Sequence, residues 1–397
     1  MPPLFLHDEG AGGRDMRKVD IIGVGMTSFG KHVDKTFVEL GAMAILEAMR
    51  DADIKPSQIG AGFSACVLAG RLFGAVTSGQ TIFWEAGINC IPIVNVENAC
   101  TSGSTAINLA WTGIAAGMYD TAIVVGVEKM IVSQLGLISS GDTELDTLEG
   151  LVTPASFAMR AVRHMKTYGT TPGQLALVAV KNRLHASLNS LAQFKDPISV
   201  EDVLNAPMIA DPLTRLSCCP NADGAAAVIL CTAGKSRHFK SRPVRLAASV
   251  LVTGSYENPL DLVPWETDAR ACQEAYDLAG IGPSDIDVAE CHDAFTISEI
   301  LHYEAMQLCP EGEGGRLIES GATCLGGRIP VNTSGGLLSK GHPVAATGVA
   351  QIVEGVRQLR GQANGRQVEG AKAFFAQCMG GDKDGDARSC TANILTV

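Results

Sequence analysis

The chain has no excess of positive charge. Its 31 Lys and Arg residues are outnumbered by 42 Asp and Glu residues, which gives a net charge of −11. Because nucleic acid is bound through a basic surface that neutralises its phosphates, we expect no nucleic-acid partner. A phosphorylated small molecule would need a local basic cluster, and the one that includes Arg163 and Lys166 is a candidate.

Long apolar runs and a secretion signal are also lacking. No apolar segment has the length that crosses a bilayer, so no membrane association is expected. Residues 1–16 lack a basic start, a long apolar stretch and a small-residue cleavage site, and we expect them to form a mobile tail. The 12 cysteines include no CxxC pair, which favours reduced thiols in the cytoplasm and no bound metal.

An internal repeat organises the 397 residues. Residues 44–59 and 271–286 align without a gap and are identical at eight of sixteen positions, including Ala, Glu, Pro and Ser. Each copy predicts a helix that ends before a Pro-Ser turn, followed by a short strand. With 46% apolar residues and 44 glycines, the composition is typical of a compact α/β protein.

The repeat predicts two similar halves, which we place at residues 17–245 and 246–397. An apolar helix at 105–117 in the first half corresponds to a helix near residues 349–359 in the second, and a strand-like run follows each. Residues 131–210 interrupt the first half with Ser, Gly, Thr and acidic residues. We expect substrate-binding excursions there.

Cys100 and His342 occupy corresponding junctions between a strand and a helix in the two halves. A thiol near a helix N-terminus is favoured as thiolate, although a single cysteine at such a place is more often a small buried filler. His342 lies between Gly341, which permits a tight turn, and Pro343, which suits a first helical turn. If the halves pack symmetrically, the two side chains meet, and a thiol beside an imidazole is an activated nucleophile.

Two further residues follow strand-like runs at the same expected end of the sheet. Cys378 precedes a Met-Gly-Gly turn whose N–H groups are suited to stabilising an oxyanion. His292 follows the second Pro-Ser turn and its strand. Ligands of α/β sheets collect at such ends, so we add both residues to the candidate site.

These segments together resemble the thiolase superfamily over nearly the whole chain, from about Val19 to Val397. The resemblance is carried by VNVENACTSGS around Cys100, ECHDAFTISEILHYE around His292, VNTSGGLLSKGHPVAATG around His342, and QCMGG around Cys378. The His-Asp pair in HDAF is similar to the lipid-transfer (SCP2-type) thiolases and their archaeal acetoacetyl-CoA relatives.

The resemblance implies the thiolase fold, in which two βαβαβαββ halves form a five-layered α-β-α-β-α body, normally a homodimer. It implies that Cys100 takes the acyl group, that His342 accepts its proton, and that Cys378 is the acid and base. His292 and His342 would hold the enolate oxygen, and the N–H groups of Cys100 and Gly380 would form a second oxyanion hole. Coenzyme A would be a substrate, with no permanently bound cofactor.

The sequence departs from the family in two places. Many lipid-transfer thiolases have HDCF, whereas this chain has Ala294, so the acid–base cysteine would have to be Cys378. The segment that binds coenzyme A in biosynthetic thiolases is shorter here, and a small partner with a zinc ribbon and an OB fold would complete it. Arg163, Lys166, Ser334 and Gly335 are the candidate contacts to acyl-CoA in this chain.

Three functions remain open at this point. The first is thiolysis of a 3-oxoacyl-CoA or the reverse Claisen condensation, with acetoacetyl, longer, sterol and aromatic acyl groups such as benzoylsuccinyl-CoA all compatible. The second is a ketoacyl synthase-like condensing enzyme, which would not need Cys378. The third is a catalytically silent acyl-CoA-binding subunit of a complex, which the presence of Cys100 and His342 disfavours.

Overall fold

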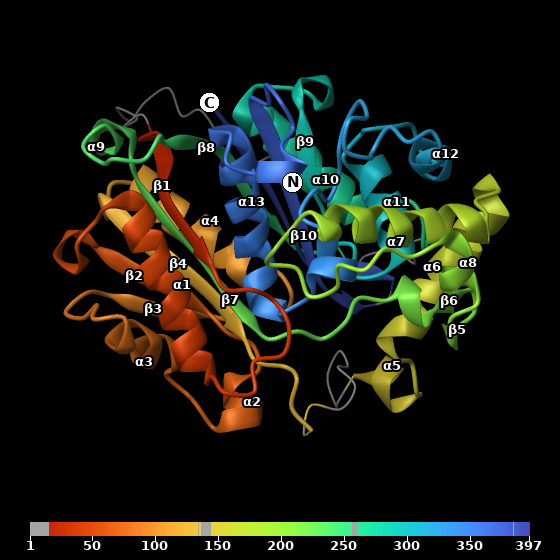
Figure 1. Ribbon diagram of the computed structural model, residues 1–397, viewed down its shortest axis with the longest axis horizontal. Helices are drawn as coiled ribbons and strands as arrows, with labels where there is room; N and C mark the ends of the chain where they lie inside the picture. The colour runs from red at the N-terminus through yellow and green to blue at the C-terminus, as the bar shows by residue number, and fades with distance from the viewer. Residues whose placement is uncertain (1–15, 134, 136–143, 256–260, 384) are drawn as a thin grey trace.

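The computed structural model describes residues 16–133, 135, 144–255, 261–383 and 385–397, and a nine-stranded sheet runs through it (Figure 1). Its strands occur in the order β3-β2-β4-β7-β1-β8-β11-β10-β9. Their bounds are β1 Val19–Met26, β2 Ala61–Ala65, β3 Ile93–Val96, β4 Thr121–Glu128, β7 Gly224–Thr232, β8 Val244–Val252, β9 Val288–Glu290, β10 Ala373–Lys383 and β11 Asp386–Thr396. A separate hairpin joins β5, Met208–Ala210, to β6, Leu213–Thr214.

Helices occur between the strands along the whole described chain. The α-helices are α1 Phe37–Ala52, α2 Ala69–Phe73, α3 Ser78–Glu85, α4 Ser102–Ala115, α5 Leu145–Leu148, α6 Thr153–Tyr168, α7 Pro172–Ser187, α8 Val200–Leu204, α9 Ala233–Ser236, α10 Glu266–Ala279, α11 Thr296–Ala305, α12 Gly314–Glu319 and α13 Thr347–Arg360. None of the described helices has both the length and the apolar character that a membrane span requires.

The strand order repeats when it is read inward from each edge of the sheet. The first half contributes β3-β2-β4-β7-β1, and the second contributes β9-β10-β11-β8. In the second half, the position that corresponds to β3 is taken by Val331, which forms a parallel bridge to Ala289 of β9. The halves meet where Asp20 and Ile21 of β1 pair with Arg245 and Val244 of β8. The repeat predicted from the sequence is therefore confirmed.

The paired segments that revealed the repeat have the predicted local structure. Helices α1 and α10 are each followed by a 3-10 turn that starts at the proline, Pro56–Gln58 and Pro283–Asp285, and then by a short strand. Thr36 caps α1 by accepting a hydrogen bond from the Glu39 N–H, and the Glu39 carboxylate accepts one from the Thr36 N–H. This reciprocal capping fixes the start of the helix.

The buried side chains separate into layers on either side of the two half-sheets. One apolar cluster joins α1 and α3 to the outer face of the first half-sheet, and another joins α10 and α11 to the outer face of the second. A third cluster fills the middle, where α4 and α13 lie between the half-sheets (Figure 1). This is the five-layered α-β-α-β-α thiolase fold that the resemblance implied.

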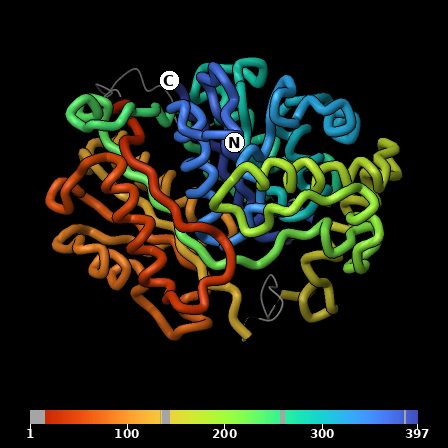
Figure 2. The backbone as a smooth tube through the Cα atoms, in the orientation of Figure 1, coloured from red at the N-terminus to blue at the C-terminus, as the bar shows by residue number. Residues whose placement is uncertain are grey.

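The interrupting segment of the first half packs against the second half. Phe157 and Ala161 of α6 and Leu175 and Val178 of α7 belong to the same buried cluster as α10 and α11. Figure 2 shows this yellow-green part of the chain beside the blue C-terminal half. The tail expected at residues 1–16 falls outside the described residues except for Met16, and the boundary expected after residue 245 falls inside β8.

Candidate active site

Cys100 lies in a tight turn between β3 and α4. Ala99 adopts the left-handed conformation, with φ at 47°. The Ser102 hydroxyl accepts a hydrogen bond from the Asn98 N–H at 2.7 Å and donates one to the Ala99 carbonyl at 2.6 Å. These bonds close the loop just before α4 begins, so the half-buried thiol is held at the helix N-terminus as the sequence predicted.

His342 follows a π-helical turn, Gly336–Lys340, and a left-handed glycine, Gly341 with φ at 107°. Its Nδ1 lies 2.7 Å from the Thr347 hydroxyl, which itself donates to the Pro343 carbonyl at 3.0 Å. Since the hydroxyl has one proton and gives it to Pro343, it must accept from His342 Nδ1–H. The Nε2 atom of the neutral ring therefore keeps its lone pair and is suited to accept a proton.

His292 begins the loop after β9 and is held by its backbone. Its N–H donates to Gln377 Oε1 at 3.0 Å, and its carbonyl accepts from His302 Nε2 at 3.0 Å. Neither ring nitrogen of His292 has a hydrogen-bond partner among the described residues, although the side chain is buried. Buried polar atoms are rarely left without a partner, and at a site such atoms are available to a substrate.

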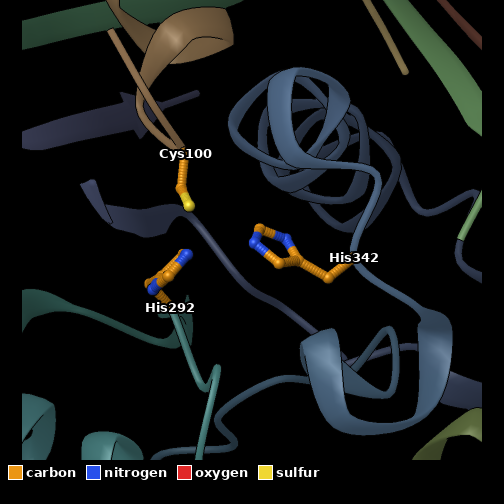
Figure 3. Close-up of side chains that lie close together, drawn as sticks. All are labelled: Cys100, His292 and His342. Atoms are coloured by element: carbon orange, nitrogen blue, oxygen red, sulfur yellow. The ribbon is translucent and has the colours of Figure 1, made fainter. Parts of the chain in front are cut away.

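The structure brings Cys100, His292 and His342 together from three different loops (Figure 3). The Cys100 Sγ and one ring nitrogen from each histidine all lie within 4.8 Å of one another. The two imidazole rings meet edge to face, with centroids 5.1 Å apart. One thiol and two imidazoles are also ligands that soft metals accept, so these three residues are where a metal would bind, and the expectation of none stays a prediction.

Burial sets the protonation of this group at neutral pH. It raises the pKa of Cys100 to about 12 and lowers the pKa of His342 to about 4. The pKa of His292 also lies well below its usual value, chiefly because of burial and then because of His342. Burial therefore opposes the expectation that the helix N-terminus favours thiolate at Cys100, and the raised thiol pKa beside the lowered imidazole pKa favours a neutral pair at rest.

Cys378 joins this group from β10. Its Sγ lies 3.3 Å from the Cys100 carbonyl, and burial raises the pKa of its thiol well above the usual value. A Cβ atom on Gly380 would lie 3.0 Å from the Cys100 nitrogen, so the two backbones are in close contact. A backbone hydrogen bond from Gly381 also lowers the pKa of Cys100, although by less than burial raises it.

The seam between the halves lies directly beside the site. The carbonyl of Ala345, three residues after His342, fits against Gly103 of α4 and Gly126 of β4, where a Cβ atom on either glycine would collide with it. Glu128, at the end of β4, accepts from the N–H groups of Val67 and Leu68 in its own half, each at 3.0 Å, and from the Ala345 N–H across the seam at 3.4 Å. These contacts hold the turn after His342 against the half that carries Cys100.

The four candidate contacts to acyl-CoA lie elsewhere. Arg163 is exposed on α6 and paired with Asp261, and Lys166 is exposed near the end of the same helix. Ser334 is buried and donates to Glu290 through both its N–H, at 2.9 Å, and its hydroxyl, at 2.6 Å. Gly335, also buried, packs against Ala186. The structure does not bring these four together with Cys100, and their assignment stays a prediction.

Sequence reasoning missed several residues around the site. Glu128 is buried, and burial raises its pKa to about 7, while its charge helps to raise the pKa of Cys100. Cys219 donates its N–H to the Ala294 carbonyl at 2.8 Å, and the pKa of its thiol is raised well above the usual value, chiefly by burial and then by Cys100. A single acidic residue closing the apolar run TAIVVGVE was the one available signal for Glu128.

Asp293, the second residue of HDAF, supports His342 from a distance. Its buried carboxyl group accepts from the Leu337 N–H at 2.6 Å and the Leu338 N–H at 3.2 Å. Both belong to the π-helical turn that precedes His342, and burial raises the pKa of Asp293 well above its usual value. The HDAF loop thus supplies one residue to the site and uses the next to anchor the opposite loop.

Family models match almost the entire described chain. Residues 19–234 match the thiolase N-terminal domain, and residues 253–387 match the thiolase C-terminal domain-like family. The chain belongs to the thiolase family. It is therefore an acyltransferase of the thiolase class, and the family uses coenzyme A as a substrate.

Individual relatives of this thiolase agree with the family match. The chain is 40% identical over 359 residues to benzoylsuccinyl-CoA thiolase subunit BbsB of Thauera aromatica, covering 89% of this chain and 92% of the relative. It is also 40% identical over 371 residues to acetyl-CoA acetyltransferase of Methanothermobacter thermautotrophicus, covering 92% and 97%. Among solved structures, the Ltp2-ChsH2(DUF35) aldolase has a TM-score of 0.82 at 25% identity, covering 97% and 99%.

Proposed function

We propose that this thiolase cleaves a 3-oxoacyl-CoA by thiolysis, or runs the reverse Claisen condensation, through an acyl group on Cys100. The observation that carries this proposal is the convergence of the Cys100 sulfur and one ring nitrogen from each of His292 and His342 within 4.8 Å, with Nδ1 of His342 held by Thr347. Because the thiol is protonated at rest and the imidazole is neutral, transfer of one proton generates the nucleophile at the moment of attack.

The chemistry proceeds in two steps. His342 Nε2 accepts the Cys100 proton as the sulfur attacks the keto carbon, and the C–C bond breaks with its electron pair passing into the departing acyl-CoA as an enolate. His292 and His342 hold the enolate oxygen, and the Cys378 thiol gives its proton to the α-carbon. The coenzyme A thiol then gives its proton to the Cys378 thiolate and attacks the acyl-cysteine. Cys100 leaves as a thiolate and recovers its proton from His342, while the N–H groups of Cys100 and Gly380 stabilise the second oxyanion.

We place the substrate among the larger acyl groups, as a specialised degradative thiolase acting on an aromatic or branched 3-oxoacyl-CoA such as benzoylsuccinyl-CoA. Support comes from the 40% identity to a benzoylsuccinyl-CoA thiolase subunit. The acetyl-CoA acetyltransferase relative at the same identity makes acetoacetyl-CoA the other substrate to compare. Relative kcat/KM for these two thioesters decides between them.

A ketoacyl synthase-like condensing enzyme is the alternative reaction for the same Cys-His-His set. Such an enzyme obtains its carbanion by decarboxylation and needs no second cysteine. The Cys378 thiol, 3.3 Å from the Cys100 carbonyl, favours the thiolase reaction because it is in place to move the α-proton. If Cys378→Ala condensed a malonyl thioester as fast as the unaltered enzyme, the alternative would replace our proposal.

The acyl-enzyme is the decisive test. Incubation with acetyl-CoA followed by intact-mass measurement should add one acetyl group to the enzyme and none to Cys100→Ala. Cys324→Ala, which removes a half-buried thiol from a loop, is the matched control and should be acetylated normally. Thiolysis that continued in Cys100→Ala would rule out the proposal, and an unaltered enzyme that was never acetylated would favour a silent subunit.

We further propose that the enzyme is a homodimer and works with a small partner subunit. Strand β3 lies at the edge of the sheet with one described neighbour, β2, and exposes Val94, so a second copy can pair with it. Leu145, Leu148 and Met208, all between β4 and β7, are exposed apolar side chains suited to a zinc-ribbon and OB-fold partner. The relative is named as a subunit, and the solved neighbour as a complex with a DUF35 protein.

A further inference from the structure

A closed ring of buried polar side chains surrounds the peptide of His292. Gln377 accepts from the His292 N–H, and His302 contacts the His292 carbonyl, both at 3.0 Å. The two arms meet at Asp268, where Gln377 Nε2 reaches Oδ1 at 2.8 Å and His302 Nδ1 reaches Oδ2 at 2.5 Å. Asp268, His302 and Gln377 are all buried, and they come from α10, α11 and β10.

The hydrogen bonds of these side chains place one of their protons. A carbonyl can only accept, so His302 Nε2 must carry a proton for His292. Asp268 Oδ1 receives the Cys390 thiol at 3.4 Å besides the Gln377 amide, and Asp268 Oδ2 lies 2.5 Å from His302 Nδ1. His302 also contributes, after burial and His342, to keeping the pKa of His292 low.

Aromatic packing around His302 restricts the movement of the hydrogen-bonded ring formed by Asp268, His302 and Gln377. The Trp265 indole stacks on the His302 imidazole, with centroids 5.3 Å apart and planes 7° from parallel. The guanidinium group of Arg160 lies over the Trp265 ring, with its Cζ atom 4.4 Å from the ring centroid. Rigid support of this kind decides how accurately a site residue is aimed.

The orientation of the His292 imidazole depends on its backbone, because neither ring nitrogen has a hydrogen-bond partner among the described residues. His342 differs, since Thr347 holds its ring directly at 2.7 Å. A rotation of the His292 peptide would therefore swing the imidazole without breaking any side-chain hydrogen bond. The bonds from Gln377 and His302 oppose that rotation, together with the Ala294 N–H, which donates to the His292 carbonyl at 2.9 Å.

We propose that Asp268, His302 and Gln377 are positioning residues that set the His292 imidazole at the substrate oxygen, and that they act only on the carbon–carbon step. This inference rests on the proposed function, in which His292 holds the enolate oxygen. Transfer of the acyl group between Cys100 and coenzyme A forms no enolate. Loosening the ring should therefore slow carbon–carbon cleavage and leave acyl exchange intact.

The test uses two substitutions of His302, each of which keeps one of its two hydrogen bonds, either to Asp268 or to the His292 carbonyl. In His302→Asn, the amide nitrogen replaces Nδ1 and keeps the bond to Asp268 but is too short to reach His292. In His302→Gln, the amide nitrogen replaces Nε2 and can still donate to the His292 carbonyl. Two rates are measured on the full-length enzyme: thiolysis of acetoacetyl-CoA, and exchange of the acetyl group between acetyl-CoA and labelled coenzyme A.

We expect His302→Asn to lower the ratio of thiolysis to exchange by about 10- to 100-fold, the usual cost of losing an orienting partner. His302→Gln should recover most of that ratio. The matched control is His164→Asn, which changes a buried histidine paired with Glu304 at 3.0 Å that does not contact His292. It should lose stability and keep the unaltered ratio.

An unchanged ratio in His302→Asn, an equal fall of both rates, or the same ratio change in His164→Asn would overturn the inference. If His302→Asn does not fold, Gln377→Asn shortens the other arm and is judged by the same ratio. Failure of the proposed function has a different signature, because the unaltered enzyme itself would then form no acetyl-cysteine and exchange no acetyl group.

Discussion

His342 and His292 present their imidazoles to the same thiol but are held in opposite ways. Thr347 fixes the ring of His342 at Nδ1, whereas Gln377 and His302 fix the peptide of His292 and leave its ring nitrogens without described partners. A general base needs one defined tautomer, which a side-chain partner provides. A group that meets a substrate oxygen needs free nitrogens and an accurate direction, which backbone anchoring provides.

This difference also separates the steps that each residue serves. His342 takes the Cys100 proton when the sulfur attacks and returns it when the sulfur leaves, which occurs in both carbon–carbon cleavage and acyl exchange. His292 is needed only when an enolate oxygen appears. The two residues can therefore be distinguished by measuring the two half-reactions separately.

The largest effect is expected for His342→Ala. It removes the proton acceptor, and general-base catalysis contributes about 10²–10⁴-fold. Thiolysis and acetyl exchange should both fall by that order, measured with acetoacetyl-CoA and with labelled coenzyme A. Loss of thiolysis alone would remove the proposed distinction between the histidines.

A smaller and selective effect is expected for His292→Ala. Removing one donor to a developing oxyanion costs about 10²–10³-fold. Thiolysis should fall by that factor while acetyl exchange stays near the unaltered rate, since exchange forms no enolate. If exchange fell in parallel with thiolysis, His292 would have to act on the acyl-cysteine as well.

Thr347→Val should reduce activity about 10-fold, as is usual for losing a partner that orients a site histidine. Valine keeps the shape of threonine but cannot accept from His342 Nδ1–H, so the ring loses its fixed tautomer. Both half-reactions should slow, in contrast to changes around His292. Thr347→Ser retains the hydroxyl and should keep most of the activity; equal losses in the two variants would contradict the tautomer argument.

The smallest expected effect is in the pH profile of the unaltered enzyme. Protonated His342 cannot accept the Cys100 proton, so activity is lost as the pH falls through the pKa of His342. That pKa is lowered to about 4, hence kcat/KM for acetyl exchange should change little between about pH 5.5 and 7. An acidic limb near the ordinary histidine pKa of about 6.5 would show that the base is less buried than described.

The sequence predicted the architecture well because its internal repeat carries that information. The copies at 44–59 and 271–286 led to two halves, and the halves led to the meeting of Cys100 and His342, which the structure shows. Cys378 and His292 could be added to the candidate site because the carboxyl ends of neighbouring strands meet at one edge of a sheet.

What the sequence did not predict depends on contacts between residues far apart in the chain. The raised pKa of Cys100 results chiefly from burial, while a backbone hydrogen bond from the distant Gly381 opposes it and the charge of Glu128 adds to it. Asp268 and His302 carry no local pattern that marks them as neighbours of His292. Ser334 lies in the VNTSGGLLSKGHPVAATG segment, whereas its bonds to Glu290 depend on how two loops fold together.

The fit of the Ala345 carbonyl against Gly103 and Gly126 affects how this enzyme loses activity when it is heated. The thiol belongs to one half and the base to the other, and at these two glycines the Ala345 backbone meets backbone with no side chain on the glycine to absorb a displacement. A slight parting of the seam would separate Cys100 from His342 while each half keeps its own sheet and helices. On heating, catalytic activity should therefore be lost at a lower temperature than helix content.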